Sequence, residues 1–361
     1  MNIASSTLTD PATVSDAGVR SVSTLTLLIS ALLLAAPIQA QSPLFDFRRI
    51  GPGLYASLTR EDIAPSSYAN AIVVEGEDGV LLVDTQHSPS AGRDLVEAIR
   101  ERTDVPVRWI VNTHFHGDHV WGNAALLEAW PEAVLLGHPH TRDRLVDEGA
   151  EQVAQERVRL GDRITRIEGA LVSGQIGEAD QERAEEALAR ARGQLRELET
   201  LRVTPPVELV VERITLDLGG REVEVFHPGP AHTDGDLVVW VPDARFLAAG
   251  DLLEDGALWL EGADVRGWAE ALRELQELNP DRVLPSHGRL RTDAVLLATH
   301  ADFLGDALSL NRQGVPVESV AWVDALDEHR SALEVYGVEG AAFEAYVAAV
   351  RRGLEGGEEE R

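Results

Sequence analysis

Six consecutive residues in the first half of the chain, His114-Phe115-His116-Gly117-Asp118-His119, hold three imidazoles and a carboxylate. Imidazole and carboxylate are ligands that Zn²⁺ and similar cations prefer. His114 and His116 are two residues apart, so in an extended segment they point to the same side. Asp118 and His119 then fall on the turn that opens a helical pattern. The segment can offer two ligands to one metal and two to a neighbour, and we predict a dinuclear metal site with further ligands elsewhere.

Strand and helix patterns alternate around this segment. The apolar run 107–111 predicts a buried strand that leads into His114. The runs 71–74 and 80–83 predict a hairpin whose second strand ends at Asp84. Helical patterns follow these strands, and strands that alternate with helices predict an α/β domain.

Three more candidate ligands follow strand-like runs later in the chain. His232 comes after the run 223–226, Asp251 after the run 246–249, and His287 at the end of a short run. In an open α/β arrangement such strand ends converge on one edge, where sites are found. Each residue alone would be an ordinary surface or capping residue. Together with the six-residue cluster they predict one site.

The amino-acid composition excludes some kinds of ligand and disfavours some kinds of partner. The chain has no cysteine, which excludes thiolate ligands, disulfides and a cysteine nucleophile, and all 32 of its basic residues are arginine. Its formal charge of −29 argues against nucleic acid and anionic membrane as partners. We therefore expect neither of these as a partner.

The N-terminus has the pattern of an export signal. Arg20 precedes the apolar run 25–36, and a small residue, Ala40, ends the segment. The run is too short to span a bilayer as a helix. We predict a signal peptide over residues 1–40, cleavage after Ala40, no membrane insertion after cleavage, and a periplasmic or secreted protein. The alternative is an uncleaved anchor.

The remaining chain divides into a main domain over 41–290, a helical segment over 291–355 and a charged, disordered tail over 356–361. Within the main domain, apolar residues recur at helical spacing over 142–203 and predict a helical hairpin insertion. This insertion is either a solvated addition or a lid or dimer surface. Strand patterns resume after it over 207–216.

The ordered set of motifs resembles the metallo-β-lactamase superfamily over residues 44–290. The matching residues are Asp84 in Leu82-Val83-Asp84-Thr85, the cluster 114–119, His232, Asp251 and His287. The resemblance implies an α/β fold, an αββα sandwich of two mixed sheets flanked by helices, with the helical hairpin as an insertion.

The resemblance also implies roles for these residues. By the family pattern, His114, His116 and His232 bind one metal, whereas Asp118, His119 and His287 bind the other. Asp251 bridges the two metals, and Asp84 holds the cluster loop by hydrogen bonds. The implied cofactor is a pair of Zn²⁺ ions, with iron or manganese also acceptable to nitrogen and oxygen ligands. Such a pair activates water for attack on a carbonyl, and we expect Asp118 to be catalytic as well as a ligand.

The residue at position 251 favours one branch of the superfamily. Asp251 stands where thiolate-containing lactamases place cysteine, so the chain looks more like glyoxalase II, lactonases and related esterases. The segments 107–114 and 119–123 are similar to the exported quinoprotein relay system zinc metallohydrolases. We predict an exported dinuclear zinc hydrolase whose substrate is a small-molecule carbonyl compound, namely an ester, thioester, lactone or lactam. The alternatives are a true β-lactamase, a hydroxyacylglutathione hydrolase-like thioesterase, and a non-catalytic accessory protein of a periplasmic oxidation pathway.

Other chemically interesting residues are assigned structural roles. The family pattern uses no histidine at positions 87, 138, 140 or 227, and we expect these side chains to be structural or at the surface. We expect Trp259 and Trp268 to lie in the core.

Overall fold

The computed structural model describes residues 45–60, 68–291, 293–316 and 319–356. The predicted signal peptide and residues 357–361 of the predicted tail lie outside these residues. Within the described part, no helix combines the length and apolar character needed to cross a bilayer.

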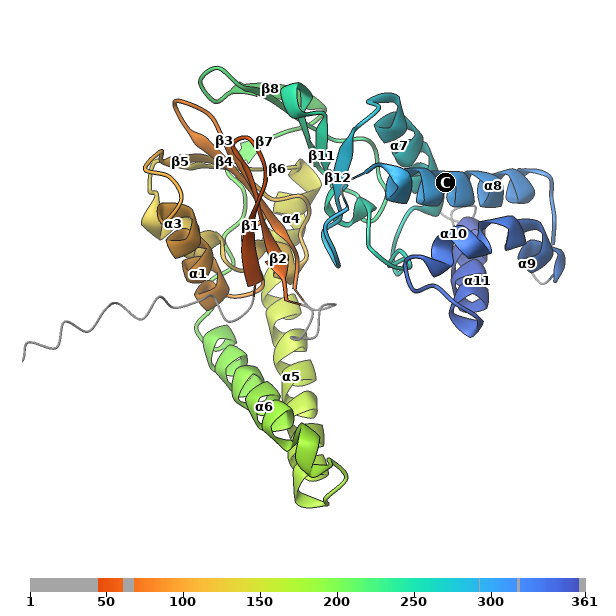
Figure 1. Cartoon of the computed structure of the whole chain (residues 1–361), viewed down its shortest axis with the longest axis horizontal. Helices are drawn as coiled ribbons and strands as arrows, with labels where there is room; N and C mark the ends of the chain where they lie inside the picture. The colour runs from red at the N-terminus through yellow and green to blue at the C-terminus, as the bar shows by residue number, and fades with distance from the viewer. Residues whose placement is uncertain (1–44, 61–67, 292, 317–318, 357–361) are drawn as a thin grey trace, which may run out of the picture. The chain divides into compact units, whose positions relative to one another are not determined.

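Two mixed β-sheets form the centre of the fold (Figure 1). The first sheet contains, in chain order, β1 (Phe45–Gly51), β2 (Leu54–Thr59), β3 (Ala71–Glu75), β4 (Val80–Val83), β5 (Val107–Val111), β6 (Val134–Gly137) and β7 (Glu208–Leu209). Its pairs are antiparallel from β1 to β4 and parallel from β4 to β7.

The second sheet has the order β12-β11-β10-β9-β8. Its strands are β8 (Arg213–Asp217), β9 (Glu222–Phe226), β10 (Val238–Val241), β11 (Phe246–Ala248) and β12 (Arg282–Leu284). All neighbours are antiparallel except β11 and β12, which are parallel.

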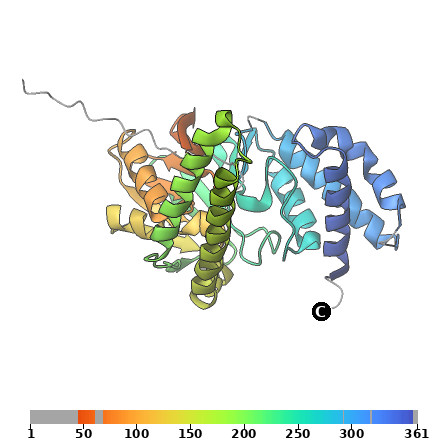
Figure 2. The same ribbon diagram turned by 90° about the horizontal axis from the view of Figure 1, so that it is seen from below.

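The helices lie outside the sheets (Figures 1 and 2). They are α1 (Pro89–Arg100), α2 (Gly117–Val120), α3 (Asn123–Ala129), α4 (Pro139–Asp147), α5 (Gly149–Val172), α6 (Glu178–Leu198), α7 (Val265–Glu277), α8 (Val295–Arg312), α9 (Ala321–Leu326), α10 (Arg330–Glu334) and α11 (Ala341–Gly356). The described residues also form the short 3₁₀ helices η2 (Pro242–Ala244), η3 (Gly250–Leu252) and η4 (Asp327–His329).

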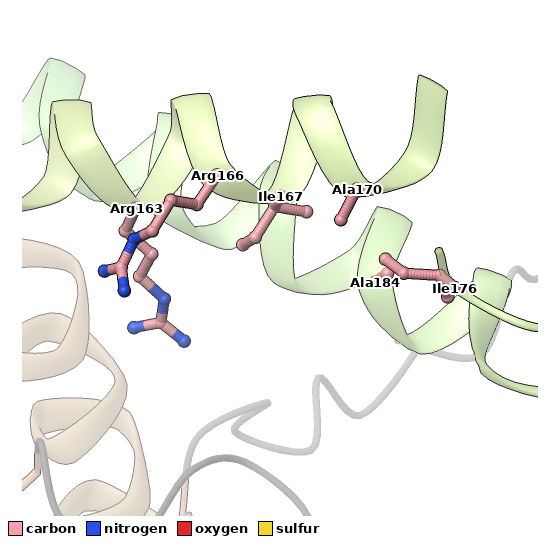
Figure 3. A pocket seen from close by; sticks show the side chains of 6 residues that line it. All are labelled: Arg163, Arg166, Ile167, Ala170, Ile176 and Ala184. Atoms are coloured by element: carbon pink, nitrogen blue, oxygen red, sulfur yellow. The ribbon is translucent and has the colours of Figure 1, made fainter. Parts of the chain in front are cut away.

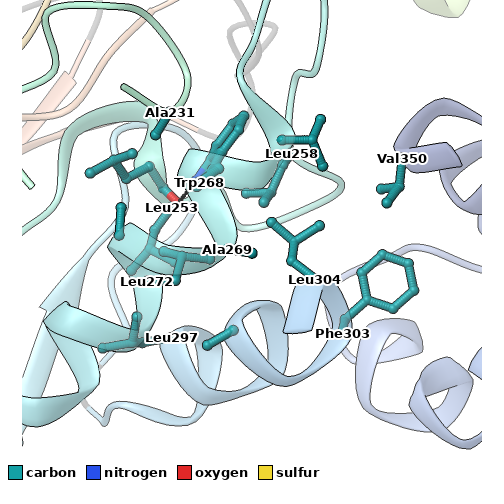
Figure 4. Close-up of a cluster of buried hydrophobic side chains, with 14 of the residues drawn as sticks. Ala231, Leu253, Leu258, Trp268, Ala269, Leu272, Leu297, Phe303, Leu304 and Val350 are labelled. Carbon is teal, nitrogen blue, oxygen red and sulfur yellow. Dashed lines mark hydrogen bonds between the residues drawn. The ribbon is translucent and has the colours of Figure 1, made fainter. Parts of the chain in front are cut away.

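Buried apolar layers hold the sandwich together. Strand β4 shows how one strand serves two layers, because successive side chains point to opposite faces. Leu81 and Val83 face the core between the sheets, whereas Val80 and Leu82 face the core under α1 and α3. A third core covers the outer face of the second sheet with side chains of α7, α8 and α11 (Figure 4). These layers confirm the predicted αββα sandwich.

The strand pattern predicted over 207–216 corresponds to two strands in different sheets. The structure divides it into β7, which pairs with β6 of the first sheet, and β8, which pairs with β9 of the second sheet. The chain therefore changes sheets between Leu209 and Arg213. The apolar run continues through this change because Val210 is buried between the two sheets.

The helical hairpin insertion is confirmed and consists mainly of α5 and α6. Its base packs against the helix that carries part of the six-residue cluster, since Val120 and Trp121 share a buried apolar cluster with Val153 of α5 and Leu198 of α6. Farther along, a hollow of about 400 Å³ is lined by Arg163, Arg166, Ile167, Ala170, Ile176 and Ala184 (Figure 3). The contacts at the base of the hairpin therefore hold α2 in place.

A buried histidine on α8 should make the stability of the protein sensitive to acid. His300 is fully buried, and neither ring nitrogen makes a hydrogen bond within the described residues. Burial lowers the pKa of His300 to about 4, although the nearby Glu254 carbonyl and Asp255 carboxylate favour its charged form. The unfolded chain therefore takes up a proton near pH 6.5, before the folded chain does, and stability falls as the pH drops from there towards 4.

We expect His300→Leu to remove this dependence. The free energy of unfolding of the variant minus that of the wild type should rise by on the order of 3 kcal/mol as the pH falls from 7 to 4. Urea unfolding of both proteins across this range, with a chelator present so that metal does not contribute, measures the difference. Parallel pH profiles for the two proteins would contradict the assignment.

Candidate metal centre

The strand ends bring the predicted ligands to one edge of the sandwich. Strands β4 and β5 are parallel, so Asp84 and His114 follow them at the same end. Strands β11 and β12 are also parallel, and Asp251 and His287 follow these strands in the same way. His232 lies in the loop between β9 and β10. Both sheets therefore contribute side chains to one site.

The first group of donor atoms contains three ring nitrogens and one carboxylate oxygen. Nδ1 of His116 lies 2.9 Å from Nε2 of His114 and 3.1 Å from Nε2 of His232. Oδ2 of Asp251 lies 3.6 Å from the His114 nitrogen and 3.3 Å from the His232 nitrogen. Four tetrahedral ligands at about 2.1 Å from a zinc ion lie about 3.4 Å from one another. These four atoms are spaced as ligands of one cation.

The second group contains Asp118, His119 and His287. Oδ2 of Asp118 lies 3.6 Å from Nε2 of His119 and 3.2 Å from Nε2 of His287. Oδ1 of Asp251 lies 3.2 Å from the His119 nitrogen and 3.5 Å from the His287 nitrogen. This spacing also suits a single cation.

Asp251 joins the two groups through its separate carboxylate oxygens, Oδ2 toward the first and Oδ1 toward the second. Its position depends on the preceding residue. Gly250 has φ +58, and a Cβ at this position would lie 3.0 Å from Cβ of Thr113. Glycine therefore permits both the left-handed backbone and the close approach of this turn to the cluster loop.

Unpartnered buried atoms show that the residues fit a cation. Nε2 of His119 and Oδ1 of Asp251 are buried and make no hydrogen bond within the described residues, although they lie only 3.2 Å apart. Buried polar atoms are normally paired, because leaving one unpaired costs about 1–3 kcal/mol. Two such atoms that are close but not aligned with each other point to a shared third partner. Nothing in the donor set conflicts with a divalent metal.

The three imidazoles of the first group have lowered pKa values, which favours their neutral form. Burial lowers the pKa of His114 well below its usual value, with the neighbouring His119 adding to the effect. Burial and the adjacent His232 lower the pKa of His116 to about 4. Burial lowers the pKa of His232 as well. Neutral imidazole is the form that binds a metal.

The second group is dominated by negative charge. Burial alone would lower the pKa of His119, but Asp251, Asp118 and Asp84 outweigh it and raise the pKa well above the usual value. The pKa of His287 is raised in the same way, mainly by Asp251. The carboxylates of Asp118 and Asp251 have lowered pKa values, because His119 and His287 outweigh the effect of burial. A buried site of this charge favours cations.

Asp84 holds the cluster loop and one ligand ring. Its Oδ1 accepts a hydrogen bond from the Thr113 amide at 2.8 Å, and its Oδ2 accepts one from the Thr113 hydroxyl at 2.8 Å. The same Oδ2 lies 2.8 Å from Nδ1 of His119. A proton on Nδ1 leaves Nε2 of that ring free to face the second group.

Replacing this carboxylate tests its role in orienting His119. Asp84 has φ 60, a left-handed conformation that asparagine also adopts readily. Asp84→Asn therefore keeps the backbone while removing the charge that holds the His119 proton. We expect the second donor group to bind a divalent metal about 10–100-fold more weakly, measured by titration against a chromophoric chelator. Asp78→Asn, which removes an exposed carboxylate, is the control, and equal affinities in both variants would contradict the role of Asp84.

A residue that the sequence analysis missed supports His287. Asn70 is buried, and its Nδ2 donates to the carbonyls of Pro285 at 2.9 Å and Gly288 at 3.1 Å. Its backbone amide donates to the Ser286 carbonyl at 2.6 Å. Asn70 therefore binds the backbone on both sides of His287. A lone asparagine directly before the predicted strand 71–74 gave no local signal of this contact.

The histidines expected to be structural lie outside both donor groups. His138 caps α4 by accepting a hydrogen bond from the His140 amide, and its ring stacks on His227. The ring of His87 packs against Tyr68. Trp268 is fully buried as expected, but the expectation for Trp259 was wrong because that side chain is 59% exposed.

Comparison with known proteins identifies the family. Residues 65–287 match the profile of the metallo-beta-lactamase superfamily. The chain is 24% identical over 237 residues to metallo-beta-lactamase type 2 of Bacillus sp., an alignment that covers 64% of this chain and 71% of the relative. It is also 24% identical over 226 residues to a linear primary-alkylsulfatase of Pseudomonas sp., which covers 60% of this chain but only 41% of the alkylsulfatase.

A shorter match and a solved structure agree with this family. A hydroxyacylglutathione hydrolase of Synechococcus sp. is 34% identical over 85 residues, or 22% of this chain and 33% of that protein. The solved metallo-beta-lactamase from Pontibacter korlensis superimposes with a TM-score of 0.52 at 18% identity, covering 73% of this chain and 99% of that one, and shows the same fold. Because the superfamily profile covers more than half of the chain, the chain belongs to the metallo-β-lactamase superfamily and is a metal-dependent hydrolase.

Proposed function

We propose that the protein is a dinuclear zinc hydrolase that cleaves a carbonyl compound, namely an ester, thioester, lactone or lactam. The observation that carries this proposal is the position of Asp251, whose two oxygens face separate donor groups. One carboxylate that serves two sets of ligands fits a pair of cations better than a single ion. Zinc suits the nitrogen and oxygen donors, and iron or manganese are the alternatives that metal analysis would reveal.

The residues of the site would have different roles. His114, His116 and His232 would hold one cation, and Asp118, His119 and His287 the other, with Asp251 shared. When bound, the metal pair would activate water and polarise the substrate carbonyl. Asp118 and Asp251 supply negative charge that offsets part of the charge of the cations, while Asp84 holds the proton on Nδ1 of His119. Asp118 is half-buried, so it lies within reach of a substrate and we propose that it contributes to catalysis.

A substrate panel tests the proposed function. Zinc-loaded protein should hydrolyse members of a panel of chromogenic esters, thioesters, lactones and β-lactams, and a chelator should abolish the activity until zinc is returned. The relatives justify the β-lactam and a hydroxyacyl thioester of glutathione within this panel, and they add one further arm, an alkyl sulfate. Full metal content without turnover of any carbonyl compound would instead support the non-catalytic accessory role.

We also propose that residues 1–40 direct export, so that the mature protein acts in the periplasm or outside the cell. The proposal is supported by the order of Arg20, the apolar run 25–36 and the small residue Ala40. N-terminal sequencing of protein recovered from the periplasm or medium should begin at Gln41. Recovery in the cytoplasm with residues 1–40 still present would overturn it.

A further inference from the structure

The seam between α5 and α6 is closely packed near the base of the hairpin. Apolar residues face the seam at seven-residue spacing on both helices, as in other helices that pack side by side. Val153 and Leu198 are buried at the base. Leu160 and Ala191 lie seven residues farther from the base on their helices and belong to the same buried cluster. The spacing predicts that the next pair is buried as well.

The seam is incomplete farther from the base. The next pair, Ile167 and Ala184, lines the hollow of about 400 Å³ and is only half-buried. Ala170 of α5 and Ile176, which follows α5, complete the apolar lining (Figure 3). Two of these side chains are alanines, which fill little space. Protein interiors are close-packed, and apolar atoms beside a gap lose favourable contacts. The hollow is therefore an unfilled part of an apolar seam.

One end of the hollow is positively charged. The side chains of Arg163 and Arg166 extend from α5, and both guanidinium groups lie at the end away from Ala170 and Ile176 (Figure 3). Side chains three residues apart on a helix are neighbours, and like charges at this spacing destabilise each other. The hollow thus joins a cationic end to an apolar end.

Neighbouring carboxylates do not neutralise these two arginines. Neither guanidinium makes a hydrogen bond or an ion pair within the described residues. Glu156 is paired with Arg159 at 3.5 Å, whereas Arg163 acts on Glu156 from farther away. Asp162, one turn before Arg166, makes no ion pair with it. Acidic residues outnumber basic ones by 61 to 32 in this chain, so two adjacent arginines that lack such a partner are suited to an anion from outside the chain.

We infer that this hollow is a binding site for a single-chain amphiphile with an anionic head group. The head group would accept charge-assisted hydrogen bonds from both guanidinium groups, and the chain would fill the apolar part of the seam. Sites for small molecules measure about 300–1,000 Å³, so this hollow has room for one short chain and not for a two-chain lipid. The site is independent of the proposed hydrolase function, because none of its residues is a candidate metal ligand.

Octane-1-sulfonate is the probe for this site. Its head group stays charged at every pH used, and sulfonate is a weak metal ligand, so the metal centre contributes little to binding. Methanesulfonate supplies the head group alone, and 1-octanol supplies the chain without the charge. Calorimetric titration of the zinc-loaded full chain, below the critical micelle concentration, measures each affinity. We expect octane-1-sulfonate to bind about tenfold or more tightly than either of the others.

Variants of the lining residues test both ends of the hollow. The double variant Arg163→Gln with Arg166→Gln should bind octane-1-sulfonate about tenfold or more weakly and bind 1-octanol as the wild type does. Ala184→Phe fills the apolar end and should weaken binding of both compounds while both arginines remain. Arg157→Gln removes an exposed arginine of α5 outside the hollow, and its affinity should stay within about twofold of wild type.

Hydrogen exchange locates the bound probe on the chain. A ligand in the hollow should slow exchange of the α5 and α6 amides that surround it. We expect this protection in the wild type and in Arg157→Gln, and its loss in the double arginine variant. Because the substituted side chains are at least partly exposed, all variants should fold and keep the zinc content of the wild type.

Several results would overturn the inference. These are no binding of octane-1-sulfonate by the wild type, equal affinities for octane-1-sulfonate and 1-octanol, or an equal loss of affinity in Arg157→Gln and in the double arginine variant. Protection near the metal ligands in place of the hairpin would also overturn it. None of these results would bear on the hydrolase function, which is measured separately by ester hydrolysis.

Discussion

Asp251→Asn is expected to bind one zinc ion or fewer in place of the proposed pair, and to lower kcat/KM by about a thousandfold or more. The amide has one oxygen that can act as a ligand, whereas the carboxylate presents Oδ2 to one donor group and Oδ1 to the other. The substitution also removes a buried negative charge that lies within 3.6 Å of four ligand histidines.

Metal analysis after dialysis, together with ester hydrolysis at saturating zinc, measures both effects. Asp143→Asn removes an exposed carboxylate that is paired with Arg142 on α4, and should match the wild type in both assays. If Asp251→Asn kept the full zinc content and rate, the two donor groups would not form one shared centre.

Asn70→Asp is expected to destabilise the loop that carries His287. The Nδ2 amide group of Asn70, which now donates to the Pro285 and Gly288 carbonyls, would be replaced by one carboxylate oxygen that repels both of them. A buried charge would also face these carbonyls, so we expect a loss of about 3 kcal/mol in free energy of unfolding. Displacement of His287 should weaken binding of the second zinc ion about 10–100-fold and leave the first largely unchanged.

Zinc titration and urea unfolding of the same preparations test this prediction. Asn279→Asp makes the same substitution at an exposed position outside the site and should change neither quantity. If Asn70→Asp does not fold, Asn70→Ser removes the donors without adding charge and should show the same selective loss at the second zinc site. Equal weakening at both zinc sites would show that Asn70 supports the fold in general and not His287 in particular.

The fold and the positions of the candidate ligands were predictable from the sequence for the same reason. Buried strands are short apolar runs, and polar side chains such as Asp84 and His114 follow them directly. Parallel strands place their ends at one edge, so these residues were expected to meet, whereas the αββα arrangement and the division of the ligands into two groups were implied by the family resemblance. The change of sheet between β7 and β8 was not predictable, because Val210 stays buried while the strand partners change.

The supporting residues could not be found in this way. Asn70 binds the Pro285 carbonyl across 215 residues of sequence, and no local pattern reports such a contact. Trp259 was expected in the core because tryptophan is apolar, yet the same segment alternates, with Leu258 buried and the indole exposed. Side-chain direction in an irregular segment depends on its anchors, and these become visible only in three dimensions.

Because both sheets contribute ligands, bound metal would also affect the conformational entropy that the chain loses on folding. The metal pair would connect segments near residues 114, 232, 251 and 287, and so close long loops of the chain, one of which contains the whole α5–α6 hairpin. In the unfolded state these segments diffuse apart, and closing such loops carries an entropic cost that grows only slowly with their length. A chain without cysteine cannot form the covalent cross-links that commonly stabilise exported proteins. Its cofactor would take over that role, so that an insertion as long as the hairpin adds little to the cost of bringing the two halves together.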